Sequence, residues 1–134
     1  TEESNVHPKF KEAFIRANAR DAISTPQYDS KLPVVAVRAL RNRGTAEFGA
    51  LQLRLLKELE AGNIHRQEAQ EEVEKFWIGA LRRAAVDGDI EMGSLMAGQS
   101  VGLVDKVLSI GELLTELLTD AEKELAAVRR KLGC

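Results

Sequence analysis

Residues 88–104 read GDIEMGSLMAGQSVGLV, and the interpretation of the whole chain starts from this stretch. Its centre places two glycines, a hydroxyl, a thioether and a carboxamide within seven residues. We predict a turn here that opens into a short helix ending near residue 104. Glycine allows a flat or anionic ligand close to the backbone, and a helix N-terminus offers free N–H groups. From the residue types alone, a plain helix cap at Ser94 explains the turn slightly better than a ligand site does.

Hydrophobic spacing on both sides of the turn predicts a mainly α fold with a small extended, β-like insert. We expect helices at residues 7–20, 45–61 and 66–86, the second of them capped by Thr45. A last helix should follow Ser109, which forms a predicted capping box with Glu112. Residues 34–40 are the one predicted strand. A single strand cannot form a sheet, so its partner is either residues 23–26 or a segment outside this chain.

Composition excludes several classes of function. The 134 residues carry 19 basic and 21 acidic side chains, a net charge of −2, and only 4% aromatic residues. This balance argues against nucleic-acid binding, which needs a basic face or stacking aromatics. We find no apolar run long enough to span a membrane and no leader at the start, so the expected location is cytoplasmic. Cys134 is the only cysteine, which excludes an internal disulfide and a thiolate zinc site.

Other candidate sites have simpler structural interpretations. His7 and His65, the only histidines, lack partners at metal-ligand spacing and are expected to begin helices. The acidic residues around Gly88 lack the closing glutamate of a calcium loop, so we expect a solvated turn and no metal site. Phe76 and Trp77 are expected in the core. The leucine stripe of the last helix is short for a coiled coil, so packing within the chain is the favoured interpretation.

Three segments carry a resemblance to a known family. Residues 79–104, GALRRAAVDGDIEMGSLMAGQSVGLV, resemble the C-terminal signature of the nitronate monooxygenases, formerly called 2-nitropropane dioxygenases. The flavin-dependent enoyl-acyl-carrier-protein reductases share this signature. Residues 1–14, TEESNVHPKFKEAF, resemble the segment after the last barrel strand of these enzymes, and residues 33–48, PVVAVRALRNRGTAEF, resemble the extended piece and helix that follow.

The resemblance implies that residues 1–134 are a single C-terminal segment of an FMN-binding TIM (β/α)8 barrel enzyme. Residues 1–21 would be the helix after the last barrel strand, residues 22–87 a helical insertion, and residues 88–134 the flavin-pocket turn with the C-terminal helices. The implied FMN-contacting residues are Gly93, Ser94, Met96, Ala97, Gly98 and Gln99. The resemblance puts the general-base histidine and the phosphate loops upstream, so we expect no catalytic residue here and no turnover by this chain alone.

The implied function is that of an FMN-dependent oxidoreductase of the nitronate monooxygenase type, which oxidises alkyl nitronates with O2. Two alternatives stay open: an FMN-dependent enoyl-acyl-carrier-protein reductase, and a helical interaction module without catalysis. The expected partners are a small-molecule substrate, either a nitronate or an enoyl thioester, and an upstream barrel segment or chain. We expect no nucleic acid or membrane partner, and we leave a homodimer open.

Overall fold

The computed structural model describes residues 1–133, which fall into two compact units. One unit contains residues 6–105, and the other combines residues 1–5 with the residues from 106 onward. The described chain is mainly helical and contains one two-stranded sheet. This confirms the predicted combination of helices with a small β insert.

The sheet pairs β1 (Ala22–Ser24) antiparallel with β2 (Arg38–Leu40). Of the two partners that the sequence left open for this strand, residues 23–26 or a segment outside the chain, the first is observed, with the pairing shifted to residues 22–24. The predicted strand at 34–40 was too long. The ladder ends at Thr25, whose hydroxyl accepts a hydrogen bond from the Val37 N–H at 3.0 Å. A side chain takes the place of a backbone acceptor there, and residues 33–37 leave the sheet as an extended segment.

Helix α1 (Pro8–Arg16) begins after His7, whose Nδ1 accepts a hydrogen bond from the N–H two residues later. His7 thus begins a helix as predicted, but the predicted helix over residues 7–20 was too long. At Ala17 the backbone turns to an extended conformation, with ψ at 146°. A separate 3-10 turn, η1 (Ala19–Asp21), follows because the Asp21 carboxylate accepts from the Asn18 N–H at 2.7 Å and caps a new start.

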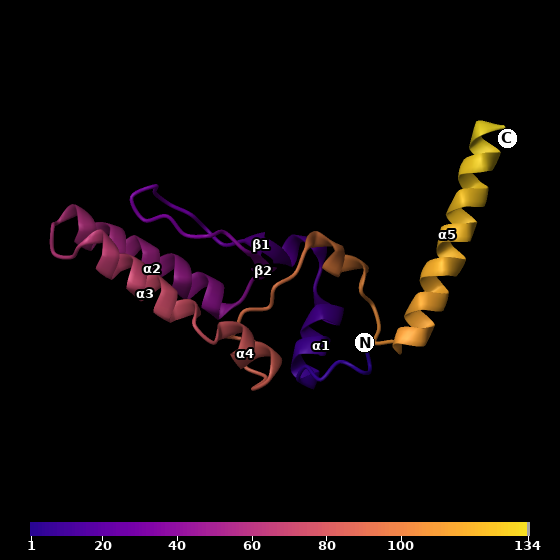
Figure 1. The fold of residues 1–134 in the computed structure, drawn as a ribbon, viewed down its shortest axis with the longest axis horizontal. Coiled ribbons are helices and arrows are strands. Elements are labelled where there is room, and N and C mark those ends of the chain that lie inside the picture. Colours follow the sequence, from indigo (N-terminus) through magenta and orange to yellow (C-terminus); the bar gives the residue numbers. More distant parts are fainter. Residues whose placement is uncertain (134) are drawn as a thin grey trace. The chain divides into compact units, whose positions relative to one another are not determined.

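The predicted helix over residues 66–86 is two helices, α3 (Arg66–Trp77) and α4 (Ala80–Ala85). They are separated at Gly79, whose φ of +74° a right-handed helix cannot contain. Helix α2 (Arg43–Glu60) lies beside α3 (Figure 1). Its cap is Asn42, and the predicted cap Thr45 was wrong because Thr45 occupies the third helical position and closes the capping box.

Two apolar clusters hold residues 6–105 together. In the first, α2 and α3 pack around Phe48, which is completely buried. The Phe48 ring centroid lies 4.8 Å from that of Trp77 and 5.5 Å from that of Phe76, so both aromatics pack against the core as predicted, although each is only partly buried. In the second cluster, Leu95 packs with residues of α1, the sheet and α4.

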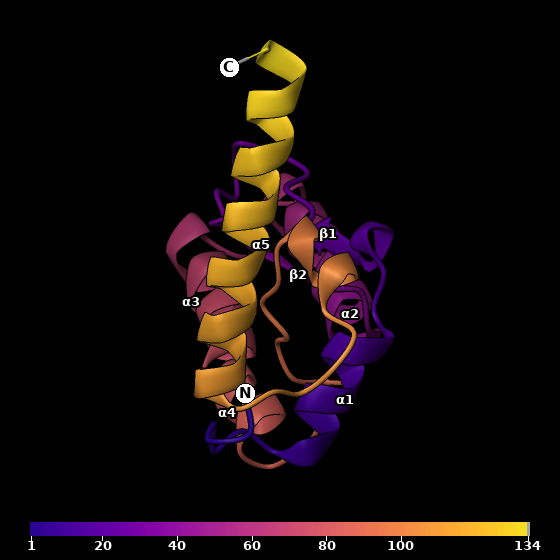
Figure 2. The ribbon, with the colours of Figure 1, turned by 90° about the vertical axis from the view of Figure 1, so that its right-hand side faces the viewer.

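The chain ends in η2 (Gln99–Leu103), a 3-10 helix, and α5 (Ile110–Leu132). The predicted capping box of α5 is confirmed, because Ser109 Oγ accepts from the Glu112 N–H while the Glu112 carboxylate accepts from the Ser109 N–H. That the leucine stripe of α5 packs within the chain stays a prediction, because α5 lies in the unit separate from residues 6–105. Helix α5 is one continuous helix (Figure 2), and none of its residues is buried within the unit that it forms with residues 1–5. No described helix is both long and apolar enough to cross a membrane.

Candidate functional site

The loop at residues 90–93, which precedes Ser94, is anchored by Asn42. Its side-chain amide donates hydrogen bonds to the carbonyl oxygens of Ile90 and Gly93, both at 2.8 Å. The amide oxygen of the same side chain accepts from the Thr45 N–H at 2.9 Å and thereby caps α2. One asparagine therefore joins the start of a helix to a loop about fifty residues later in the chain, and this fixes the loop on which the candidate site depends.

Residues 95–97 run along the free edge of β2. The Leu40 N–H donates to the carbonyl oxygen of Leu95 at 2.9 Å, and the Ala97 N–H donates to that of Arg38 at 3.1 Å. A single antiparallel bridge, between Ala39 and Met96, results. Side chains alternate along an extended segment, so Leu95 enters the core while its neighbours on both sides turn to the opposite face.

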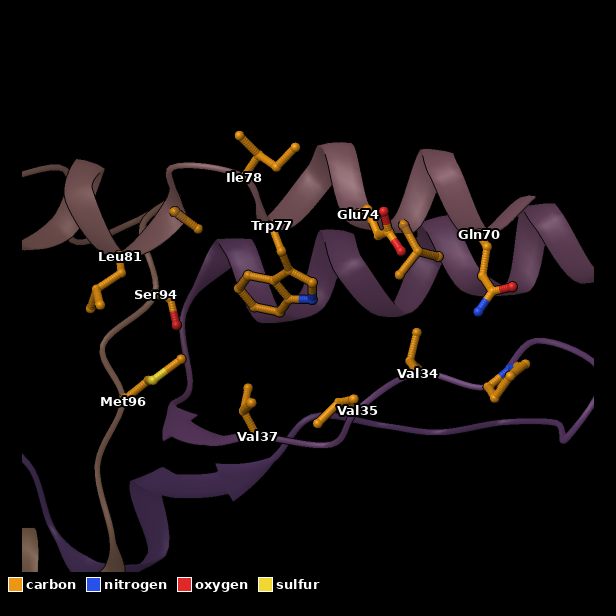
Figure 3. Close-up of a pocket in the computed structure, with 13 residues that line it drawn as sticks. Val34, Val35, Val37, Gln70, Glu74, Trp77, Ile78, Leu81, Ser94 and Met96 are labelled. Atoms are coloured by element: carbon orange, nitrogen blue, oxygen red, sulfur yellow. The ribbon is translucent and has the colours of Figure 1, made fainter. Parts of the chain in front are cut away.

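That opposite face borders a pocket of about 550 Å³ (Figure 3). Helix α3 forms one long wall, and the extended segment at residues 33–37 forms the other. Ser94, Met96 and Leu81 lie at one end of the pocket, whereas Gln70 lies at the other. The lining between the ends is mostly valine and aromatic, so the pocket suits an apolar and elongated ligand.

Ser94 is a buried polar residue at the end of the pocket that it shares with Met96 and Leu81, both about half exposed. Only 3% of Ser94 is exposed, and its N–H donates to the carbonyl oxygen of Ala80 at 2.9 Å. Within residues 1–133, its hydroxyl has no hydrogen-bond partner. The competing interpretation of Ser94 as a helix cap was wrong, because η2 begins only after Gly98 and its cap makes no side-chain bond. A buried hydroxyl without a partner is unusual, and this one belongs to a residue that lines the pocket.

The other end of the pocket is polar and open. Gln70 and Glu74, one helical turn apart on α3, line it together with Val34 on the facing segment (Figure 3). Glu74 is the only charged side chain in the described lining, and it is exposed to solvent. Trp77 lies between this end and Ser94, and its ring also packs against Phe48. The pocket therefore has a neutral hydroxyl at one end, apolar walls, and a carboxylate at the other.

The structure brings together only two of the six predicted FMN-contacting residues, Ser94 and Met96. Gly93 is tightly packed: a Cβ there would collide with the carbonyl oxygen of Asp89 and lie 2.6 Å from the backbone nitrogen of Ala84. Ala97 packs against the apolar cluster that contains Leu95.

The last two predicted residues lie away from this lining. A Cβ at Gly98 would meet nothing closer than the Ser100 hydroxyl, at 3.6 Å, so no contact within residues 1–133 requires a glycine there. Gln99 lines a separate hollow of about 430 Å³ together with Arg20 and neighbouring residues of η1 and η2.

Sequence reasoning missed the long walls of the pocket. Residues 34–37 were interpreted as part of a strand, and Trp77 as a core residue alone. A signal was available in α3, because residues 70, 74 and 77 recur at helical spacing and share a face. That face mixes polar and apolar side chains, so it did not stand out as either a buried or a solvated surface.

Comparison with known proteins gives a likeness to solved structures. No family model matches the chain, and no curated protein matches it. FabK from Thermotoga maritima superimposes with a TM-score of 0.70 at 30% identity, over 92% of this chain and 34% of that one. A mutant of FabK from Thermotoga maritima, in which one methionine is replaced by alanine, gives a TM-score of 0.65 at 28% identity, over 95% of this chain and 32% of that one.

The chain thus spans about a third of the length of the FabK chains that it matches. FabK is an enoyl-acyl-carrier-protein reductase, a flavoenzyme with a TIM barrel like that of the nitronate monooxygenases. Over the matched segment, the chain therefore resembles one part of a TIM-barrel flavoenzyme.

Proposed function

We propose that this chain forms the C-terminal wall of the flavin and substrate pocket of an FMN-dependent oxidoreductase, and that the reaction is reduction of an enoyl thioester. The observation that carries the proposal is the pocket beside Ser94 and Met96, in a chain that matches FabK along 92% of its own length. The same two residues lie in residues 93–99, GSLMAGQ, the turn on which the sequence resemblance depends.

The residues of the pocket fit the ring of a flavin but not its phosphate. Ser94 has a buried hydroxyl without a partner among the described residues, which matches the polar edge of an isoalloxazine ring. Met96 is half-exposed at the pocket, and its polarizable thioether suits contact with a flat aromatic system. The one charged lining residue is Glu74, which would repel a phosphate. The phosphate must therefore be bound by another polypeptide segment.

The proposed roles of the chain's own residues are binding and orientation. When bound, the flavin supplies the transfer of hydride. Ser94 donates a hydrogen bond to an acceptor at its end of the pocket, either on the ring or on the substrate carbonyl. Trp77 and the valines of residues 34–37 cover the apolar part of the substrate and keep water from it. General acid–base catalysis is assigned to residues outside this chain, and the isolated chain should not turn over.

Nitronate oxidation is the second candidate function. It is supported by residues 79–104, whose resemblance is to the signature that nitronate monooxygenases and enoyl reductases share. The length of the pocket favours the enoyl thioester, because an alkyl nitronate of few carbons would leave most of the apolar lining uncovered. The helical interaction module remains the alternative without catalysis.

A chimera tests the proposal. Residues 1–133 would replace the matched third of Thermotoga FabK, so that the rest of that enzyme supplies the barrel. We expect a yellow protein that retains FMN and reduces an octenoyl thioester with NADH or NADPH. A Ser94→Ala chimera should lose roughly three- to tenfold in kcat/KM, the effect of one hydrogen bond in the pocket.

Each alternative gives a different result. A chimera that consumes O2 with a nitronate but does not reduce the thioester would select the monooxygenase. A chimera with the helical content and cooperative melting of FabK, but without bound flavin, would refute the proposal and favour the interaction module. A Ser94→Ala chimera with unchanged flavin affinity and kinetics would remove Ser94 from the site.

A further inference from the structure

We infer that the pocket binds an unbranched acyl chain of at least about eight carbons, and that Glu74 weakens the binding of chains that end in a carboxylate. This inference rests on the proposed function and takes, of the two acceptors named there for the Ser94 hydroxyl, the substrate carbonyl. It adds the shape and the terminal charge of the substrate, which neither the fold nor the likeness to FabK specifies.

The length follows from the two walls. Along α3, the seven steps from Gln70 to Trp77 span about 10 Å at 1.5 Å per residue, and the Ser94 end of the pocket lies beyond Trp77. On the facing side, the three steps from Val34 to Val37 span about 10 Å in an extended chain. A zigzag of single carbon–carbon bonds of about 1.5 Å covers this distance with roughly eight carbons. Two independent elements therefore give the same minimum length for a chain that reaches from Ser94 to the far end of the pocket.

The lining determines which end of the chain lies where. Ser94 is buried and its hydroxyl lacks a partner among residues 1–133, so the acceptor of the ligand, the acyl carbonyl oxygen, belongs at this end. Val37, Val35 and Val34 then follow one another along one wall, with Trp77 and Val73 on the other. None of these side chains carries a charge, so the methylene groups of the acyl chain meet only weakly polar or apolar surface.

Glu74 controls what the far end of the chain can carry. It lines the pocket near Gln70, about one helical turn from Trp77, and the structure gives it no ion pair within the described residues. Its charge is therefore free to act on a ligand. A terminal methyl group can leave the pocket beside it without penalty, whereas a terminal carboxylate would face a like charge. Because Glu74 is exposed, water weakens this repulsion but does not abolish it.

Trp77 offers a direct assay, because it is the only tryptophan of the chain and lines the pocket. Three primary amides of an eight-carbon chain would be titrated into the 134-residue protein, ending in a methyl group, an ammonium group or a carboxylate. The amide carbonyl replaces that of a thioester, so all three probes present the same group to Ser94. We expect the methyl and ammonium probes to change Trp77 fluorescence, and the carboxylate probe to bind roughly fivefold more weakly than the methyl probe.

Two variants separate the charge effect from folding. Glu74→Gln should bind the carboxylate and methyl probes equally. Glu71→Gln removes the same charge from an exposed position of α3 outside the pocket lining, and should keep the difference. Far-UV circular dichroism confirms that each variant retains its helices. Equal affinity of the carboxylate and methyl probes for the unaltered protein, or an unchanged difference in Glu74→Gln, would overturn the inference.

This assay needs no flavin, so its result is distinct from that of the chimera. If Trp77 fluorescence shows weaker binding of the carboxylate probe but the chimera is colourless, the acyl pocket is supported and the flavin function is rejected. A yellow, active chimera whose pocket ignores the terminal charge would reject the role of Glu74 alone. Probes that fail to change Trp77 fluorescence in a folded protein would reject the acyl pocket.

Discussion

Asn42 should be among the most sensitive polar positions of the chain, because its side chain serves two elements at once. It caps α2 through the Thr45 N–H and donates to the carbonyl oxygens of Ile90 and Gly93. Replacement by serine retains an acceptor for the cap but removes both bonds to the loop. Replacement by alanine removes the cap as well. The difference between the two variants therefore separates the two functions of one side chain.

The expected costs follow from the number of bonds lost. Each bond to the loop contributes about 1 kcal/mol to the free energy of unfolding, so Asn42→Ser should cost about 2 kcal/mol. Loss of the cap adds about 1 kcal/mol, which brings Asn42→Ala to about 3 kcal/mol. Asn63→Ala is the matched control, because its amide bonds the exposed Glu58 carboxylate and should contribute less than about 0.5 kcal/mol.

Urea unfolding followed by Trp77 fluorescence measures these costs in the unit that contains residues 6–105, since this is the only tryptophan and it packs against Phe48. The midpoint should fall in the order Asn63→Ala, Asn42→Ser, Asn42→Ala, with an unchanged m-value. If Asn42→Ser were as stable as the unaltered protein, the two bonds to residues 90–93 would contribute nothing, and the proposed anchoring of the loop would be refuted.

Two further predictions concern η2 and α5. Gly102→Ala should lower the free energy of unfolding by about 1–3 kcal/mol, because the new Cβ would lie 2.7 Å from the backbone nitrogen of Ala19. Gly98→Ala, the control, should lower it by less than about 0.5 kcal/mol. Equal urea midpoints for the two variants would contradict the close packing at Gly102. Hydrogen bonds from the N–H and hydroxyl of Ser109 lower the pKa of Glu112. The ionised carboxylate therefore stabilises the start of α5 fully at a pH above the ordinary pKa of glutamate. This stabilisation is lost as the pH falls through the lowered pKa. Circular dichroism between about pH 5 and pH 2 should show helix loss that is smaller in Glu112→Gln; an equal loss in both proteins would show that another group is responsible.

Local chemistry predicted the parts of the fold that depend on neighbouring residues. The capping box at Ser109 and the helix start at His7 each involve groups within three residues, and both were confirmed. The cap of α2 was assigned to Thr45 instead of Asn42, although the bond between them is equally local, because both residue types are common helix caps. The hydrophobic pattern of residues 66–86 continues through Gly79, so periodicity alone concealed the break between α3 and α4.

The candidate site was predictable only where one segment forms it. The GSLMAGQ turn identified Ser94 and Met96, which meet at the pocket, but the alternation of an extended segment directs Leu95 into the core. The walls come from residues 33–37 and from α3, whose approach depends on the packing of Phe48 and therefore on the tertiary fold. Gln99 belongs to η2 and lines another hollow, since the chain turns between the two.

The energetics of Ser94 connect the fold to the proposed site. A buried hydroxyl without a partner costs about 1–3 kcal/mol, close to the total that Asn42 contributes by holding the preceding loop. Alanine at position 94 would fill nearly the same space and avoid this cost, so stability alone gives no reason for serine. The hydroxyl becomes favourable once an acceptor enters the pocket, since the bond then forms in a place from which water is largely excluded. Asn42 thus holds the loop that precedes Ser94, and the Ser94 hydroxyl has no partner among residues 1–133, an arrangement that agrees with the binding site proposed above.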